Sequence, residues 1–456
     1  MSLENKLKSV IVESEGNKYG FVELNNLLGN TTNFLKQCGF KERSKIPVLC
    51  NDGMHVLMIT LAAISINACV ALIENKKRER EIKEILGLLD LSFILTDVVS
   101  LNIPGVNKIV FDLKAIENET YSKNMFPKLE KENQNNHAII IFSSGSSGNP
   151  KGIIRDQKNV FSHAGALGAA LLLKEKEQVL HLAPFYHAYG FEHIMAAIYS
   201  GCNNKIYNVF DFHNIIKDLK STANVVIGVP YQYELLLKKK EKIHNSKLRL
   251  LVSASAPLKE NVAIQSMTDW NVNITQLYGS SELSASIVNM DSKSSKSVGK
   301  PIKDILIKIN EEKELLVKSP YICKGYINDE YKLNMEDGWF HTGDIANIDN
   351  DGCVYIEGRL DNIINISGKK VSPEEIEKVI TSIKGVKEVY VYAEHHEIYG
   401  AIIVAQVVCT DLITEPEILS FCREKLAEYM VPAVVSIVDS ISHTSNGKIK
   451  RVKEKV

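Results

Sequence analysis

The chain has 456 residues, 45% of them hydrophobic, which is more than one hydrophobic core usually organises, so we expect two or more domains. Its 54 basic and 55 acidic residues leave a formal charge of -1, so no global field favours a nucleic acid, and any polyanion must be held locally. The eight cysteines are scattered singly without a C-x-x-C pair, which argues against a zinc site and predicts free, mostly buried thiols in a reducing cytosol.

One apolar stretch, Val56 to Ile73, has the length of a membrane span. It contains the polar residues Thr60, Ser65 and Asn67 and lacks basic residues on its N-terminal side. We therefore predict a buried helix that leads into a strand over residues 68–73. The N-terminal residues are polar and show no secretory signal, so we expect a cytoplasmic protein without a membrane span.

Helix and strand signals alternate through most of the chain, which is typical of layered α/β architecture with parallel sheets. The predicted helices are Phe21–Cys38, Arg78–Leu89, Val160–Leu173 and Pro373–Ile383. The predicted strands are Lys108–Phe111, Val179–Leu182, Val225–Val229 and Leu248–Val252.

A domain boundary is expected near Gly358, after a hairpin of residues 345–348 and 353–356. Residues 1–358 would then form a large α/β domain of several sheets, and residues 359–456 a small α+β domain.

A glycine- and serine-rich segment, SSGSSGNPKG at residues 143–152, follows the apolar strand Ala138–Phe142. Backbone N–H groups, hydroxyls and one lysine at a strand end suit a polyphosphate. The segment is not a Walker A loop, because Pro150 stands where that pattern needs a glycine and Gly152 where it needs Ser or Thr. Such a stretch can equally be a plain turn, so the neighbouring motifs must decide.

Five further segments follow in a fixed order. They are Gln276–Glu282, Gly338–Asp344, Tyr355–Asp361, Ser367–Glu377 and Thr444–Arg451. They offer an aromatic face for a base, a carboxylate for a magnesium ion, an acidic group for ribose hydroxyls and a C-terminal lysine. Each has a plain structural alternative, such as a strand exit, a turn cap or a basic surface tail. Their joint order makes five separate accidents far less plausible than one shared ancestry.

With these motifs, the chain resembles the AMP-forming adenylating superfamily, which includes acyl- and aryl-CoA synthetases, peptide-synthetase adenylation domains and firefly-type luciferases. The resemblance extends from about Lys18 to Arg451 and is closest to acyl-CoA synthetases. It implies ATP, Mg²⁺ and either CoA or the phosphopantetheine of a carrier protein as cofactors. It also implies that the C-terminal domain is a mobile lid that turns about Asp361.

The resemblance assigns roles residue by residue. Lys448 would bridge the attacking carboxylate and the α-phosphate, Glu282 would hold magnesium, and Ser281 would donate to the α-phosphate. His187 would lie beside the acyl pocket. The implied nucleotide- and cofactor-binding residues are Ser143, Ser144, Gly145, Ser146, Ser147, Gly148 and Lys151 for pyrophosphate, Ser255, Ala256, Pro257, Tyr278 and Gly279 for adenine, Asp344 and Arg359 for ribose, Asp361 at the hinge, and Gly368 and Lys369 near the thiol.

The segment Pro184–Phe191 resembles the acyl-pocket segment of acyl- and aryl-acid ligases. It lacks an Asp that would pair with an amino-acid ammonium, and burying that charge alone would be costly, so an amino acid is disfavoured. Glu192 lies close enough to leave this open, and His187 can also be read as an ordinary structural histidine. Two positions depart from the family pattern: Ser281 replaces the commoner threonine, and Ser442-His443 replaces a proline-basic pair.

Three functions remain open. The first is an ATP-dependent ligase that converts an apolar fatty or aromatic carboxylic acid to an acyl-adenylate and then to a thioester with CoA. The second is an acyl-AMP ligase that loads a carrier protein, and the third is a nucleotide-binding relative that has lost turnover, which Lys448 and Glu282 disfavour. No nucleic acid partner is expected. The short N-terminal region would leave room for a homodimer.

Overall fold

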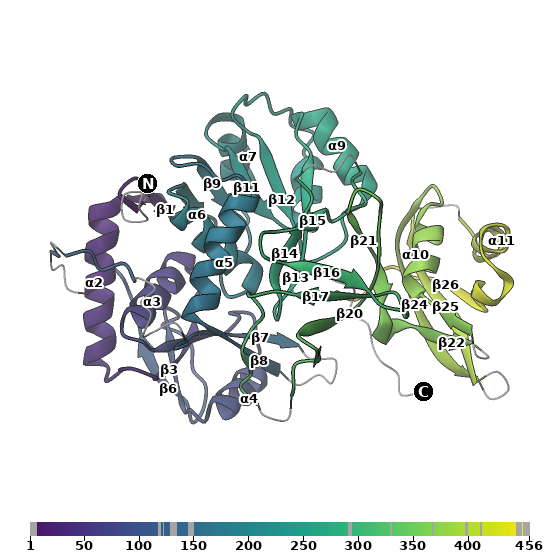
Figure 1. Ribbon diagram of the computed structural model, residues 1–456. Coiled ribbons are helices and arrows are strands. Elements are labelled where there is room, and N and C mark those ends of the chain that lie inside the picture. The colour runs from purple at the N-terminus through teal and green to yellow at the C-terminus, as the bar shows by residue number, and fades with distance from the viewer. Residues whose placement is uncertain are drawn as a thin grey trace. The chain divides into compact units, whose positions relative to one another are not determined.

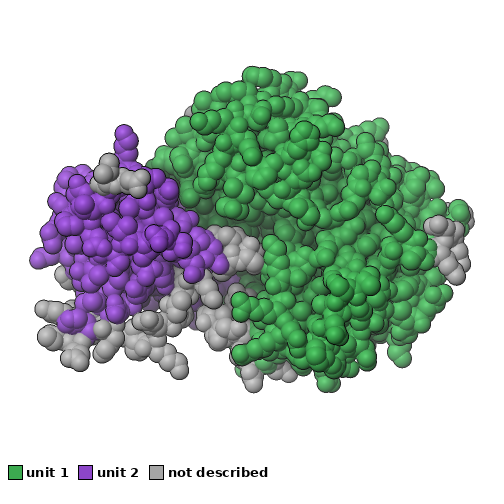
Figure 2. All heavy atoms as spheres, turned by 180° about the vertical axis from the view of Figure 1, so that it is seen from behind, with its two compact units in different colours: residues 1–306, 318–334 green, residues 307–317, 335–456 purple. Residues whose placement is uncertain are grey.

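The computed structural model describes residues 7–116, 120–121, 123–127, 135–144, 150–290, 294–328, 331–366, 369–396, 400–410, 413–443 and 449. The chain divides into two compact units, residues 1–306 with 318–334 and residues 307–317 with 335–456 (Figure 2). The predicted domain limits, 1–358 and 359–456, stay a prediction.

The described residues of the first unit form two mixed β-sheets (Figure 1). The nine-stranded sheet has the order β15-β14-β13-β12-β11-β9-β10-β1-β2. Its strands are β1 (Val12–Ser14), β2 (Asn17–Tyr19), β9 (Gln178–His181), β10 (Asn203–Ile206), β11 (Val225–Gly228), β12 (Leu250–Ser253), β13 (Ile274–Ser280), β14 (Ser284–Val288) and β15 (Lys300–Pro301). The seven-stranded sheet has the order β18-β8-β7-β4-β3-β5-β6. Its strands are β3 (Lys45–Leu49), β4 (Cys69–Leu72), β5 (Phe93–Thr96), β6 (Asn107–Val110), β7 (His137–Ser144), β8 (Pro150–Asp156) and β18 (Gly325–Tyr326).

Helices cover both faces of these sheets. They are α2 (Phe21–Gln37), α3 (Gly53–Ser65), α4 (Glu79–Leu89), α5 (Gln157–Ala170), α6 (Ala188–Tyr199), α7 (Phe212–Ser221), α8 (Pro230–Leu237) and α9 (Glu260–Trp270). One buried apolar cluster joins α2, α3, α5 and α6 to strands of both sheets, so these helices form an inner layer. A second cluster packs α7, α8 and α9 on the nine-stranded sheet, and a third packs α4 on the seven-stranded one. The predicted α/β class is therefore confirmed.

The central strands explain why the sheets are largely parallel. All four residues of β11 and of β12 are buried, as expected where helices cover both faces of a parallel sheet. Along β4, Val70 and Leu72 face the inner helices, whereas Cys69 and Ala71 face α4.

The prediction for the apolar stretch from Val56 to Ile73 is confirmed. It lies in α3, whose residues from Val56 to Ile64 are all buried, and continues into β4. Within the described part of the chain, no helix combines the length and apolar character that a membrane crossing requires. All eight cysteines are free, and all are buried except Cys38, which is exposed, and Cys409, which is partly exposed.

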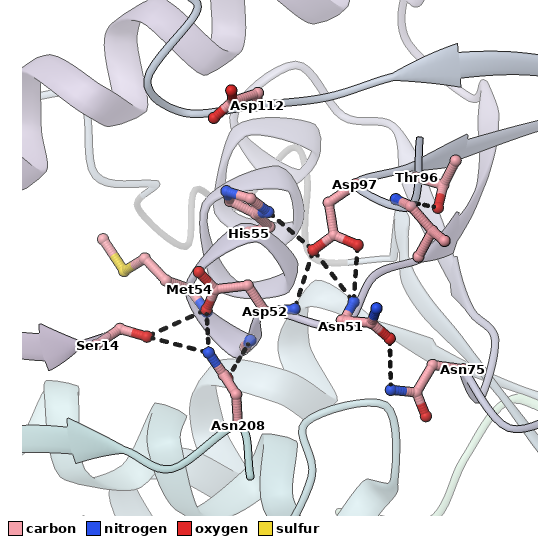
Figure 3. Close-up of polar contacts among 12 residues, drawn as sticks. Ser14, Asn51, Asp52, Met54, His55, Asn75, Thr96, Asp97, Asp112 and Asn208 are labelled. Atoms are coloured by element: carbon pink, nitrogen blue, oxygen red, sulfur yellow. Dashed lines mark hydrogen bonds and ion pairs between the residues drawn. The ribbon is translucent and has the colours of Figure 1, made fainter. Parts of the chain in front are cut away.

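Polar contacts hold the N-terminus of α3 to the ends of neighbouring strands (Figure 3). Asp97, just after β5, accepts hydrogen bonds from the backbone N–H groups of Asn51 and Asp52 at 2.8 and 2.9 Å, and from Nδ1 of His55 at 2.9 Å. Burial opposes the ionised form, but these donors hold the pKa of Asp97 below its ordinary value. Asp52 in turn caps α3 and accepts a hydrogen bond from Asn208 at 2.8 Å. The cluster thereby fastens the inner helix layer to both sheets.

In the second unit, the residues that the structure describes form three small sheets with their own apolar core. Its strands are β16 (Leu306–Ile309), β17 (Glu314–Lys318), β19 (Met335–Glu336), β20 (Trp339–Ile348), β21 (Val354–Arg359), β22 (Ile364–Ile366), β23 (Lys369–Val371), β24 (Val386–His396), β25 (Gly400–Cys409) and β26 (Val434–Ile437). Its helices are η2 (Leu360–Asn362), α10 (Pro373–Thr381), α11 (Glu415–Lys425) and η3 (Glu428–Met430). The predicted hairpin is confirmed, because β20 pairs with β21 and Ile348 faces Val354.

Most predicted elements agree with the structure to within two or three residues. One helix starts earlier than its apolar pattern indicated: α5 begins at Gln157, because the side chain of Asp156 accepts a hydrogen bond from Asn159 N at 2.7 Å. Capping by a short acidic side chain, and not the apolar periodicity, sets this boundary.

Candidate active site

The glycine- and serine-rich segment lies in an antiparallel hairpin. Ser143 and Ser144 belong to β7, and Lys151 and Gly152 belong to β8. In the pairing of these strands, Ser143 faces Lys151 and Ser144 faces Pro150. The expectation that the whole segment is a loop was therefore wrong at both ends, because ladder pairing continues into it. Gly145, Ser146, Ser147 and Gly148 lie outside the described residues, as does the side chain of Ser144.

The short strand β18 lies along β8, beside the exit of this hairpin. Ile327 N donates to Gly152 O at 2.7 Å, and a Cβ atom at Gly152 would come within 2.6 Å of the Ile327 side chain. A glycine is therefore needed for this close approach. The Lys151 ammonium lies 4.6 Å from the ring centre of Tyr331 and 5.7 Å from that of Tyr326, within the range of cation–π attraction.

The Gln276–Glu282 motif begins inside β13. This strand extends to Ser280 and turns into β14, so residues 276–280 of the motif belong to the strand. The register shifts between Tyr278 and Gly279, and a Cβ atom at Gly279 would lie only 2.1 Å from Ser284 O. The absence of a side chain at Gly279 thus allows the tight hairpin whose tip carries Ser281 and Glu282.

The carboxylate of Glu282 has a defined orientation. Its Oε1 accepts a hydrogen bond from the Tyr326 hydroxyl at 3.1 Å, and its backbone carbonyl accepts one from Cys323 N at 2.8 Å. Two segments that are distant in the sequence, the β13–β14 tip and the start of β18, therefore meet at Glu282.

A buried ion pair that was not predicted from the sequence also contacts the β13–β14 tip. Arg155 Nη1 lies 2.5 Å from Glu192 Oε1, and Nη2 donates to Ser281 O at 2.7 Å. Arg155 also bonds the Ser284 hydroxyl, and Glu192 Oε2 accepts from Ala285 N at 3.0 Å. The sequence did hold a signal for this ion pair. Arg155 follows the apolar residues Ile153 and Ile154 of β8, and a charge buried in a strand needs a partner.

The ion pair also bears on whether Glu192 could bind the ammonium group of an amino-acid substrate. Burial opposes its ionised form, but Arg155 holds the pKa of Glu192 below its ordinary value. The carboxylate is therefore engaged inside the protein, and it is not held ready for a substrate ammonium.

The residues predicted for adenine lie in or just after two neighbouring strands of the nine-stranded sheet, β12 and β13. In the parallel pair β12–β13, Ser253 faces Gln276, so Ser255 and Tyr278 both come two residues beyond this matched pair. Ser255 has a φ of +75°, which turns the chain sharply before Ala256 and Pro257. Ligands in such sheets bind outside the carboxyl ends of the parallel strands, and the Ser255 turn follows the carboxyl end of β12 at Ser253.

His187 stands at the N-cap of α6, with its ring centre 4.6 Å from that of Tyr186. Burial, with a contribution from the charge of Glu74, raises the pKa of Tyr186 to about 12. A Cβ atom at Gly190 would lie 2.1 Å from Pro184 O, so the turn into α6 requires glycine there. The role of His187 in the reaction stays a prediction.

The residues predicted for ribose come together in the second unit. Asp344 on β20 and Arg359 on β21 face each other in the strand pairing, with Oδ1 and Nη1 3.1 Å apart. Asp361, the predicted hinge residue, lies in η2 with Oδ2 3.7 Å from Arg359 Nη2. The residues of β20 that precede Asp344 are held by Glu314, which accepts hydrogen bonds from Gly343 N and from His341 Nδ1, both at 2.8 Å.

Three further predicted residues, all in the second unit, are not described in full. Lys448 and Gly368 lie outside the described residues, and only the backbone of Lys369, in β23, is described.

Comparison with protein families assigns the chain. Residues 3–327 match the model of the AMP-binding enzyme family, and residues 375–448 match that of the AMP-binding enzyme C-terminal domain. The chain belongs to the AMP-binding enzyme family. The predicted reaction class, an AMP-forming acid–thiol ligase, is confirmed with it.

Relatives of this AMP-binding enzyme span nearly its whole length. A 2-succinylbenzoate–CoA ligase of Bacillus cereus is 27% identical over 462 residues, covering 96% of this chain and 94% of its own. The 2-succinylbenzoate–CoA ligase of Listeria monocytogenes is 26% identical over 460 residues, with coverages of 98% and 96%.

Solved structures share the fold of this AMP-binding enzyme. ATP-bound MatB from Rhodopseudomonas palustris has a TM-score of 0.87 at 22% identity, covering 96% of this chain and 93% of that one. The o-succinylbenzoate CoA synthetase MenE from Bacillus subtilis, in complex with its acyl-adenylate intermediate, has a TM-score of 0.86 at 20% identity, with coverages of 98% and 96%.

A magnesium ion is expected to accompany the nucleotide of an AMP-binding enzyme. Among the described residues, no group of three or more His, Cys, Asp or Glu side chains could hold a metal ion. Mg²⁺ typically binds through one or two carboxylates together with substrate phosphates. A single oriented carboxylate, such as that of Glu282, fits this mode of binding.

Proposed function

We propose that the protein uses ATP and Mg²⁺ to activate a small aromatic carboxylic acid and then transfers the acyl group to CoA. The observation that carries the choice of acid is the near full-length similarity to 2-succinylbenzoate–CoA ligases, which covers 96% of the chain. A fatty acid is the less favoured substrate, because the curated relatives named above act on an aromatic acid.

The first step forms an acyl-adenylate. A carboxylate oxygen of the acid attacks the α-phosphorus of ATP, the bond from that phosphorus to the bridging oxygen breaks, and pyrophosphate leaves. Negative charge builds up on phosphate oxygens, so the protein contributes mainly by positioning and by fixed positive charge.

The described residues of the first unit supply part of that environment. Glu282 would hold Mg²⁺, which neutralises charge on the phosphates. Lys151, at the hairpin exit, would meet the leaving pyrophosphate, and Ser281 would donate to the α-phosphate. Tyr278 and the turn at Ser255 would bind adenine.

Residues of the second unit complete the proposal. Asp344 would accept hydrogen bonds from the ribose hydroxyls while Arg359 keeps its carboxylate oriented. Lys448 would bring a mobile ammonium to the attacking carboxylate, since lysine is a compact charge on a flexible stem. For thioester formation, residues 359–456 would turn about Asp361 and present Gly368 and Lys369 to the thiol.

An amino-acid substrate is not supported. The Pro184–Phe191 segment has no acidic residue, and Glu192 is already paired with Arg155 in the buried interior. An ammonium in the acyl pocket would therefore lack the partner that its burial requires.

Exchange of labelled pyrophosphate into ATP tests the first step. We expect exchange with 2-succinylbenzoate and related aryl acids, weaker exchange with straight-chain fatty acids, and none with phenylalanine. Adding CoA should then release AMP and yield a thioester. Exchange without CoA-dependent release, but with loading of a pantetheinylated carrier protein, would overturn CoA as acceptor. Absence of exchange with every acid would overturn the proposed activity.

A further inference from the structure

Tyr326 connects the carboxylate at the β13–β14 tip to the strand beside the glycine- and serine-rich hairpin. Its backbone pairs with Ile153 of β8, and its hydroxyl donates to Glu282 Oε1 at 3.1 Å. On the same segment, Cys323 N donates to Glu282 O at 2.8 Å. Both ends of Glu282, backbone and carboxylate, are thus held by one short stretch of chain.

The group that contacts Glu282 Oε1 is a hydroxyl, which donates a hydrogen bond without carrying a charge. A neutral hydroxyl can orient the carboxylate without cancelling its charge, which an arginine or lysine in the same place would do. We find no hydrogen-bond donor to Glu282 Oε2 among the described residues.

We propose that Tyr326 is a positioning residue for metal binding, which orients Glu282 so that one carboxylate oxygen is fixed and the other is presented to Mg²⁺. The inference rests on the proposed function, since it concerns the metal that accompanies ATP. An unfixed glutamate would lose side-chain entropy on binding the metal, so orientation in advance strengthens binding.

The variant Tyr326→Phe tests this role, because it keeps the ring beside Lys151 and removes only the hydroxyl. The matched control is Tyr207→Phe, since the Tyr207 hydroxyl donates to another carboxylate, Asp218, at 2.5 Å in a separate part of the unit. ATP binding without any acid is measured by calorimetry over a series of free Mg²⁺ concentrations. The thermal midpoint of each ligand-free protein is measured in EDTA.

We expect Tyr326→Phe to raise the half-saturating Mg²⁺ concentration about tenfold, the order associated with losing one hydrogen bond to a charged group. ATP affinity in EDTA should stay within about twofold of wild type, because the hydroxyl acts through the metal ligand. Tyr207→Phe should lower the thermal midpoint without changing the Mg²⁺ dependence.

The outcomes separate the inference from the proposed function. If the wild-type protein binds Mg²⁺–ATP and Tyr326→Phe leaves the Mg²⁺ dependence unchanged, the positioning role is overturned. The same conclusion follows if both variants shift the Mg²⁺ dependence equally, because the effect would then be one of general stability. If the wild-type protein fails to bind ATP in Mg²⁺, the proposed function itself fails.

Discussion

Arg155 and Glu192 form an ion pair in the interior of the first unit, with only 2% and 5% of their side chains exposed. The pair supports the hairpin tip that carries Glu282, through contacts with the Ser281 carbonyl and the Ala285 amide. Burying two charges costs desolvation free energy, which their mutual attraction offsets. Removal of one partner is therefore strongly destabilising, because the other charge stays buried without compensation.

We expect Arg155→Met to lower the free energy of unfolding by about 3–5 kcal/mol, because it leaves the Glu192 carboxylate buried without its cation. The double variant Arg155→Met/Glu192→Leu should recover much of that loss while still binding Mg²⁺–ATP poorly, since the tip has lost its support. Urea unfolding gives the stabilities. Equal destabilisation of the single and double variants would contradict this account of the pair.

Asp344→Asn should weaken AMP binding about 10- to 100-fold, because a charged acceptor of two ribose hydroxyls becomes a neutral one. Stability should change by about 1 kcal/mol or less, since Arg359 is 46% exposed and such pairs contribute little. Isothermal titration with AMP measures the affinity. Asp351→Asn, in the exposed turn after β20, is the control, and a similar loss there would argue against a specific ribose contact.

Lys448→Ala should reduce acyl-adenylate formation by about 10²–10³-fold, the effect of removing one group that stabilises transition-state charge. Thioester formation from a supplied acyl-adenylate should remain largely intact, because the lysine is expected to leave the site in that step. Single-turnover measurements of each half-reaction make the comparison. Equal loss of both steps would rule out this division of roles.

Stability should fall as the pH drops below about 6.5. Burial lowers the pKa of His181 to about 3 and that of His193 to about 4, from an ordinary value of 6.5. Unfolding exposes both imidazoles to protonation, so each contributes stability that is fully present above pH 6.5 and declines by about 1.4 kcal/mol per pH unit below it.

Urea unfolding between pH 7 and 5 measures this slope. Buried carboxylates with lowered pKa values, such as Glu192, add to the loss only near and below about pH 4.5. His193→Gln should flatten the slope, whereas substitution of the exposed His213 should leave it unchanged. A wild-type stability that is constant from pH 7 to 5 would refute the prediction.

The motifs in order were enough to predict the α/β class and the family, and they named Asp344 and Arg359, which the structure pairs. Local patterns failed at strand ends. β7 continues to Ser144 and β13 continues to Ser280, because each pairs with a neighbouring antiparallel strand that single-residue patterns do not reveal. The contact between Tyr326 and Glu282 could not be predicted for a similar reason, because residues 44 positions apart show no periodic pattern that relates them.

The sequence by itself determined which chemical groups are available: a serine- and glycine-rich hairpin, an acidic strand-end motif, an Asp–Arg pair and a lysine near the C-terminus. Only the tertiary structure decided which of them are oriented and by what. Tyr326 and Arg155 reach the β13–β14 tip from distant segments, and Glu192 forms an ion pair with Arg155, which lies 37 residues earlier in the chain. Side-chain identity is encoded residue by residue, whereas burial and pairing follow from sheet packing, which brings together groups that local sequence leaves unrelated.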